Sequence, residues 1–200
     1  MSLEKDIERI SEEAKRYLEI GEEDIIRVHE ISNKLLKHSE KIVSGALKSL
    51  LSSDLAIKFL KEARLTKERA AELYSRWLGQ VLKGDYGLEH AKNVFMIGLA
   101  HARYGVHRRL MCLCIGAWLR ELLRALKEVG AEDSIETAIS ISKLLIWNLV
   151  IMLQGYHIAR VESLKRASGI SPTLFERLFK LKADEVYRSI MADMKMASRK

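Results

Sequence analysis

The scarcity of chain-breaking residues constrains the fold of this sequence more than any other feature. Among 200 residues there is one proline, Pro172, and a chain with so little turn and strand punctuation fits only long helices. The length suffices for one domain with a substantial core. Nearly half of the residues are hydrophobic, which is typical of a globular chain and not of a disordered one. We therefore expect an all-α protein.

Helix-start and helix-stop signals divide the chain into consecutive helical segments. The predicted helices cover about 2–19, 22–37, 38–52, 54–63, 67–83, 87–105, 107–130, 133–167 and 172 onward. Asp54 and Thr66 are predicted N-caps, because their side-chain oxygens can accept hydrogen bonds from the first backbone N–H groups. Asp133 with Glu136 resembles a capping box. Ser171 is a further N-cap, directly before the proline.

Charge and cysteine usage indicate a soluble protein of the cytoplasm, with no membrane as partner. The net charge is +7, but the basic residues alternate with acidic ones, so a nucleic-acid-binding protein is a weak alternative. Cys112 and Cys114 are two residues apart on a helix, which places them on nearly opposite faces and favours neither a disulfide nor a shared metal. The N-terminus has no signal-peptide pattern. The longest strongly apolar run, "LLIWNLVIML", is short beside the roughly 20 residues of a membrane helix.

Two of the predicted helices are apolar around most of their circumference. They lie near residues 107–128 and 134–165 and include "LMCLCIGAWLRELLRAL" and "AISISKLLIWNLVIMLQGY". A helix of this kind must be covered on all sides. Either both helices are central in the bundle, or a second copy of the chain covers part of them. The pattern favours a homodimer built on these two helices.

One histidine, His101, lies among small and apolar residues in the stretch "FMIGLAHARYGVHRRLM". It could be a packed core residue, a catalytic base or a haem ligand. Helical spacing places Ile97 and Gly98 beside it. Gly98 is expected to leave an opening next to the imidazole, and Gly105 to end the helix one turn later, so that a flat group can approach. No HExxH, CxxC or paired-carboxylate motif is present, which favours a binding protein over an enzyme.

Three sequence elements together resemble the globin domain of globin-coupled sensors and protoglobins. They are Leu50–Ser52, then Trp77–Leu78 with Gly84–Tyr86, and then "IGLAHARYGV". The resemblance covers roughly residues 20–165. It implies a globin fold with an extra N-terminal helix, a sensor-globin domain over residues 1–168, and an appended helix over 169–200. It also implies that His101 is the proximal ligand of haem b, which is held non-covalently because CxxCH is absent.

The resemblance further implies which residues surround the haem. The cofactor-binding set is His101, Tyr74, Trp77, Leu78, Leu47, Val81, Ile97, Gly98 and Met111. Two family tyrosines are missing. Ala46 and Leu47 occupy the positions of the usual distal Phe-Tyr pair, and Leu110 and Met111 those of a proximal Trp-Tyr pair. Tyr74 is therefore the remaining candidate for a distal hydrogen-bond donor, with a core aromatic as the alternative.

The other polar residues near these motifs receive more ordinary interpretations. Three arginines, Arg103, Arg108 and Arg109, either pair with haem propionates or form a solvated basic corner. His90 and His107 are expected at the surface, and His157 at the dimer interface.

Two functions remain after these steps. The first is a haem protein that binds a diatomic gas (oxygen, carbon monoxide or nitric oxide) and acts as a gas or redox sensor. The second is a haem-free protein-interaction module of the same fold in signalling. No output domain follows the globin-like region. Residues 169–200 are interpreted as a truncated signalling linker, a docking helix for a signalling partner, or a structural cap.

Overall fold

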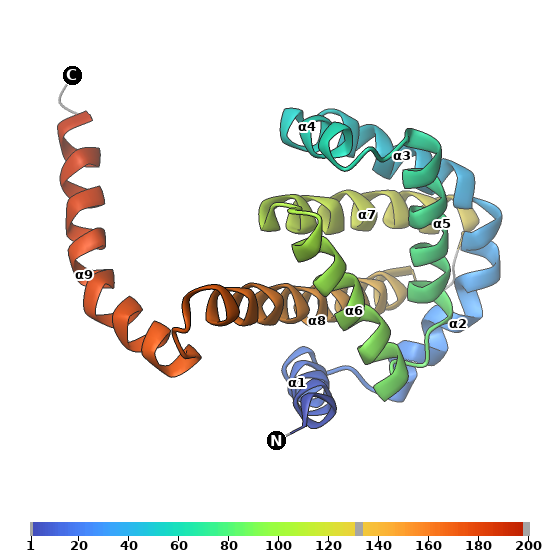
Figure 1. The fold of residues 1–200 in the computed structure, drawn as a ribbon. Coiled ribbons are helices and arrows are strands. Elements are labelled where there is room, and N and C mark those ends of the chain that lie inside the picture. Colours follow the sequence, from blue (N-terminus) through green and yellow to red (C-terminus); the bar gives the residue numbers. More distant parts are fainter. Residues whose placement is uncertain (1, 131–133, 198–200) are drawn as a thin grey trace. The chain divides into compact units, whose positions relative to one another are not determined.

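The fold is helical throughout the residues that the computed structural model describes, 2–130 and 134–197 (Figure 1). Within these residues there is no strand. The helices are α1 (Leu3–Leu18), α2 (Glu22–Lys37), α3 (Ser39–Leu51), α4 (Asp54–Glu62), α5 (Lys67–Lys83), α6 (Leu88–Arg103), α7 (Arg108–Val129), α8 (Ser134–Ser168) and α9 (Pro172–Ala197). The all-α prediction is confirmed, and each predicted helix has its counterpart.

Side-chain oxygens begin several of these helices, as the sequence predicts. The Thr66 hydroxyl accepts a hydrogen bond from the N–H of Arg69 at 3.1 Å, and that of Ser171 accepts one from the N–H of Leu174 at 3.2 Å. The prediction for α4 is wrong by one residue. Ser53 is its N-cap, and Asp54 is the first helical residue. At that position the carboxylate is stabilised by the positive end of the helix dipole. Asp133, the predicted cap of α8, lies outside the described residues.

The chain divides into two compact units, residues 1–157 and 158–200, with the boundary inside α8. The first unit contains α1 to α7 and most of α8, and the second the end of α8 together with α9. The boundary predicted from sequence, residue 168, coincides instead with the end of α8, where Gly169 has a φ of +71°. A left-handed φ of this kind is readily adopted by glycine and ends a helix.

In the first unit, α7 and α8 run side by side and α6 crosses α8 (Figure 1). Fully buried side chains of both long helices, including Leu122, Leu145, Trp147 and Ile151, form much of the core. By length and composition, α8 would also pass as a membrane span, although half of its most apolar window is buried within the fold. The core helix of a soluble protein passes the same test. Packing within the fold accounts for the buried half of this window.

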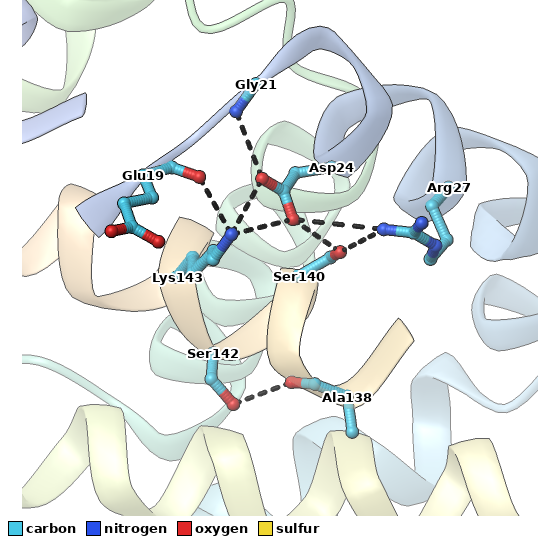
Figure 2. Close-up of polar contacts among 8 residues, drawn as sticks. All are labelled: Glu19, Gly21, Asp24, Arg27, Ala138, Ser140, Ser142 and Lys143. Carbon is cyan, nitrogen blue, oxygen red and sulfur yellow. Dashed lines mark hydrogen bonds and ion pairs between the residues drawn. The ribbon is translucent and has the colours of Figure 1, made fainter. Parts of the chain in front are cut away.

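A buried carboxylate, Asp24, joins the turn between α1 and α2 to α8 (Figure 2). Asp24 is 2% exposed. The Ser140 hydroxyl donates to Oδ1 at 2.7 Å, and Lys143 Nζ donates to Oδ2 at 3.1 Å. The backbone N–H of Gly21 also donates to Oδ2, at 3.0 Å. Burial alone would raise the pKa of Asp24, but these hydrogen bonds outweigh it and the pKa lies below its ordinary value.

Lys143 and Arg27 extend this network. Nζ of Lys143 also donates to the backbone oxygen of Glu19 at 2.8 Å, and Arg27 donates to the Ser140 hydroxyl at 3.0 Å. A buried charge is stable only when it is paired and hydrogen-bonded. The network therefore fixes the N-terminal helices against α8, which carries much of the core.

Candidate functional site

His101 lies in the last turn of α6, and its ring orientation is fixed by the helix itself. Its Nδ1 lies 2.8 Å from the backbone oxygen of Ile97, one turn earlier. A carbonyl only accepts hydrogen bonds, so Nδ1 carries the proton and Nε2 keeps its lone pair. This tautomer is the one that a metal-ligating histidine uses when its other nitrogen is held by a backbone carbonyl.

The surroundings of His101 keep the imidazole neutral. Burial lowers the pKa of His101 below its ordinary value, and the hydrogen bond to Ile97 opposes this only in part. A neutral imidazole is the form that binds iron. Proton competition for Nε2 is therefore weak at neutral pH.

Two backbone hydrogen bonds at the end of α6 fix the conformation of the chain directly after His101. The N–H of Val106 donates to the backbone oxygen of His101 at 2.9 Å, and that of Gly105 donates to Ala102 at 3.1 Å. This pair of bonds is a Schellman motif, in which the residue after the cap adopts a left-handed conformation. Gly105 does so with a φ of +72°. The predicted role of Gly105 as the end of the helix is confirmed.

Gly98 has a role different from the one that the sequence suggested. A Cβ atom on Gly98 would lie 2.0 Å from the backbone oxygen of Met152 in α8. Across the same crossing, a Cβ on Gly155 would lie 2.3 Å from the backbone oxygen of Phe95. Each glycine thus lets the two backbones approach closely. The expectation that Gly98 leaves an opening beside the imidazole is wrong, because the space is filled by α8.

Tyr74 and Trp77 of α5 meet α7 in an aromatic cluster. The Tyr74 ring lies 5.2 Å from that of Trp118, and the Trp77 ring lies 5.1 Å from it, measured between centroids. The Tyr74 hydroxyl lies 3.3 Å from Sγ of Cys114. Burial raises the pKa of the Tyr74 phenol and also that of the Cys114 thiol. Both groups therefore keep their protons at neutral pH.

One donor in this cluster has no partner within the described part of the chain. Nε1 of Trp77 is buried and makes no hydrogen bond there. A buried N–H without a partner costs about 1–3 kcal/mol, so such a group calls for an explanation. A ligand with acceptor atoms would satisfy it. Each group, taken by itself, has chemistry that suits a haem: the indole N–H can donate to a propionate, and the Nε2 lone pair of His101 can bind iron.

The remaining predicted pocket residues fall into two groups. Leu78, Val81 and Met111 are buried, as apolar walls of a pocket would be. Leu47 is half-buried and lines a groove between α3 and α5 together with Val43. The lining of that groove includes neither Tyr74 nor His101.

The expectation that His90 is a surface residue is wrong. His90 is 9% exposed, and its ring stacks on that of Tyr86 at 4.5 Å. Trp147 of α8 contacts the same ring edge-on, at 5.4 Å. Burial lowers the pKa of His90, while Asp85 and Asn148 oppose the shift.

The other charged candidates lie in solvent. His107 is exposed and serves as the N-cap of α7, where its Nδ1 accepts from the N–H of Arg109 at 3.1 Å. His157 is exposed as well. The three arginines considered for propionate pairing, Arg103, Arg108 and Arg109, are all exposed. Exposure leaves both earlier interpretations open, since propionates also extend to the surface of a haem protein.

Cys114 and Trp118 are the residues that sequence reasoning missed. They are four positions apart on α7 and so share one helical face, and that face meets Tyr74 and Trp77 of α5. The spacing of each pair is visible in the sequence. What is not visible is that the two faces meet. Both cysteines are free thiols, Cys112 exposed and Cys114 half-buried, as expected from their spacing.

The chain is similar to known proteins in both sequence and fold. Over residues 8–162 the sequence matches the model of the Protoglobin family. The fold is similar to the globin domain of a Geobacter sulfurreducens globin-coupled sensor, with a TM-score of 0.66 and 21% sequence identity. That similarity covers 72% of this chain and 96% of the other. No curated protein matches the sequence. Among the described residues, no group of three or more metal-ligating side chains occurs.

Proposed function

Because the chain belongs to the protoglobin family, we propose that it is a haem-binding globin that takes up a diatomic gas. The gas is oxygen, carbon monoxide or nitric oxide, and the protein acts as a gas or redox sensor. The observation that carries the proposal is His101: a half-buried, neutral imidazole whose Nδ1 is held by Ile97 and whose Nε2 lone pair is free.

His101 is the proposed metal ligand, and the cofactor is haem b held without a covalent bond. When bound, haem iron supplies a coordination position for the gas. The chain itself fixes the imidazole through Ile97 and the helix end after it. Because the ring is already oriented and unprotonated, binding requires neither a rotation nor the loss of a proton.

Tyr74 and Trp77 are the proposed polar groups on the other side of the haem. Both come from α5, and both have donors that could face a bound ligand. The apolar residues proposed to line the cofactor are Leu47, Leu78, Val81, Ile97 and Met111. Apolar walls exclude water, and few polar groups then decide which gas is favoured.

A colour measurement tests this proposal. Purified protein supplied with haem should show a Soret band, and His101→Ala should lose it. Protein that stays colourless after haem addition would contradict the proposal. It would favour the alternative, a haem-free interaction module, for which the replacement of the usual family tyrosine by Leu47 is the supporting observation.

We also propose that the protein forms a homodimer through α7 and α8. A groove between these helices is lined by apolar side chains that include Leu123, Ile135, Ile139 and Ile146. Ile135 is 73% exposed and Ile139 43%. An exposed apolar surface on two helices of the core is typical of an interface between copies.

Charged substitutions test the dimer. Ile139→Glu with Ile146→Glu should give a soluble monomer in sedimentation velocity. Ile26→Glu on α2 is a matched control, because Ile26 is 54% exposed and does not line the groove. A wild type that sediments as a monomer at high concentration contradicts the proposal.

The output of the sensor is proposed to involve α9. Many large apolar residues of this helix are exposed, among them Leu178, Phe179, Leu181 and Tyr187. A helix with such a surface can dock a signalling partner. We place the protein in the cytoplasm, because reduced thiols and a charged helical surface suit that compartment. We also propose that it is a binding protein and not an enzyme.

A further inference from the structure

The contact between Tyr74 and Cys114 joins two helices that are far apart in the sequence. The phenol of α5 and the thiol of α7 are 40 residues apart along the chain, and their heteroatoms are 3.3 Å apart. Both groups are neutral, since burial raises the pKa of each. Two protons are therefore available for one contact, and either group can donate.

The phenol is the stronger partner in this pair. A phenolic O–H is a good donor, whereas a thiol S–H is a weak donor and sulfur a weak acceptor. In the gas-free protein the phenol proton should thus point toward Sγ of Cys114. The ring of Tyr74 cannot easily move away, because Trp118, four residues after Cys114, packs against it at 5.2 Å. Cys114 can then control the direction of the O–H bond while Trp118 controls the position of the ring.

We propose that Cys114 is a positioning residue for Tyr74, and that its thiol competes with bound gas for the phenol proton. This inference rests on the proposed function, in which Tyr74 faces the gas. In the gas-free state the phenol donates to Cys114. When a better acceptor such as dioxygen occupies the pocket, the phenol donates to it instead. The thiol therefore lowers the oxygen affinity that Tyr74 alone would give.

A first experiment uses the apoprotein, so that it does not depend on haem. In a Cys112→Ser background, the rate of alkylation of Cys114 by iodoacetamide is measured against pH, with and without Tyr74→Phe. A phenol that donates to sulfur stabilises the thiolate. Its removal should therefore raise the apparent pKa of Cys114. An unchanged or lowered apparent pKa overturns the inference, because the phenol would then not be the donor.

A second experiment measures gas affinity in the haem protein. We expect Cys114→Ala to raise the equilibrium oxygen affinity about two- to fivefold, in line with a weak hydrogen bond, and to change carbon monoxide affinity little. The same substitution in a Tyr74→Phe background should have no effect, since no phenol proton remains to be released. Cys112→Ala is the matched control on the same helix, because Cys112 is exposed.

Three results would overturn the inference. They are a lowered oxygen affinity in Cys114→Ala, an equal effect in the Tyr74→Phe background, and an equal effect of Cys112→Ala. Each would mean that Cys114 acts through packing and not through the phenol. If the protein takes up no haem, the proposed function is contradicted. The alkylation experiment uses the apoprotein, so it still tests whether the Tyr74 phenol donates to Cys114. Failure of the proposed function and failure of this inference can therefore be told apart.

Discussion

The two sides of the candidate haem site are built in different ways. On the proximal side, His101 is held by Ile97, four residues before it, and by a helix end formed by the next five residues. On the side that we propose to be distal, Tyr74 is held by Cys114 and Trp118 of another helix. The first arrangement needs only one helix to form correctly. The second exists only when α5 and α7 pack as they do here.

This difference has a consequence for how substitutions should act. A change on the proximal side removes an interaction that no other residue duplicates. A change on the distal side alters one member of a cluster whose other members can rearrange. We therefore expect the largest effect for the proximal ligand and the smallest for a residue at the other end of its helix. Each measurement tests this difference between the two sides.

The largest effect is expected for His101→Ala, which should abolish the haem spectrum. The physical reason is that, among the described residues, no other histidine has its Nδ1 held by a backbone carbonyl. The measurement is the absorbance of purified single His→Ala variants at positions 90, 101, 107 and 157. If His101→Ala kept a normal spectrum and another variant lost it, the proximal side would lie elsewhere and the comparison would fail.

A large loss of stability is expected for Gly98→Ala. A Cβ there would meet the backbone oxygen of Met152 at 2.0 Å, and backbone cannot move aside as a flexible side chain can. Overpacking of this kind costs roughly 1–3 kcal/mol. The measurement is the free energy of unfolding of the apoprotein in urea.

Gly116→Ala is the matched control for that experiment. Gly116 is also helical, but a Cβ there would have no other atom within 4 Å. Replacement by alanine should stabilise the helix by up to about 1 kcal/mol. Equal effects at both positions would show that the crossing of α6 and α8 does not depend on Gly98.

The helices could be predicted from the sequence, because their signals are local. Thr66, Gly105 and Gly169 each mark a helix end through the conformation of a few neighbouring residues. The local conformation at His101 depends on the same kind of signal, since its hydrogen bond to Ile97 and the helix end after it lie within one short stretch. Its role as a haem ligand stays a prediction. Ser53 shows the limit of such signals: two adjacent residues, Ser53 and Asp54, are both good caps, and only the backbone decides between them.

The distal contacts and the role of Gly98 could not be predicted, because they depend on which helix lies opposite. The sequence shows that Gly98 is a helical glycine next to His101, but not that α8 uses the space it leaves. It predicts a surface position for His90, because it does not show that Tyr86 and Trp147 enclose the ring. The sequence does not show that Cys114 contacts Tyr74, because this contact depends on the packing of α5 against α7.

A smaller effect is expected for Tyr74→Phe on the distal side. Bound dioxygen carries partial negative charge and gains from a donor, whereas carbon monoxide gains much less. Loss of a hydrogen bond worth about 1.4 kcal/mol should speed oxygen release about tenfold. The measurement is the dissociation rate of each gas by stopped flow.

The two gases serve as controls for each other in that measurement. Equal changes for oxygen and carbon monoxide would show that Tyr74 acts through packing or access. No change for either would place its hydroxyl outside the pocket. In both cases Tyr74 would donate no hydrogen bond to bound gas, and the comparison with the proximal side would have to be restated.

The smallest effect is expected at His90, in the first turn of the helix that carries His101. Burial lowers the pKa of His90 in the folded protein below its ordinary value of about 6.5, whereas the unfolded chain keeps that value. As the pH falls through about 6.5, the unfolded chain binds a proton that the folded chain does not. The folded state should therefore lose stability from neutral pH toward pH 5, by about 1.4 kcal/mol for each pKa unit between the two states.

The substitution that isolates this contribution is His90→Gln, which keeps a polar side chain but does not titrate. The free energy of unfolding of the apoprotein is measured in urea between pH 7 and pH 5, for the wild type and the variant. Other histidines titrate equally in both proteins, so the difference in slope belongs to His90. A steeper decline in the wild type confirms a neutral, enclosed ring held between Tyr86 and Trp147. Parallel curves would mean that His90 takes up its proton as readily in the folded protein, and that the proximal helix is open to water at its first turn.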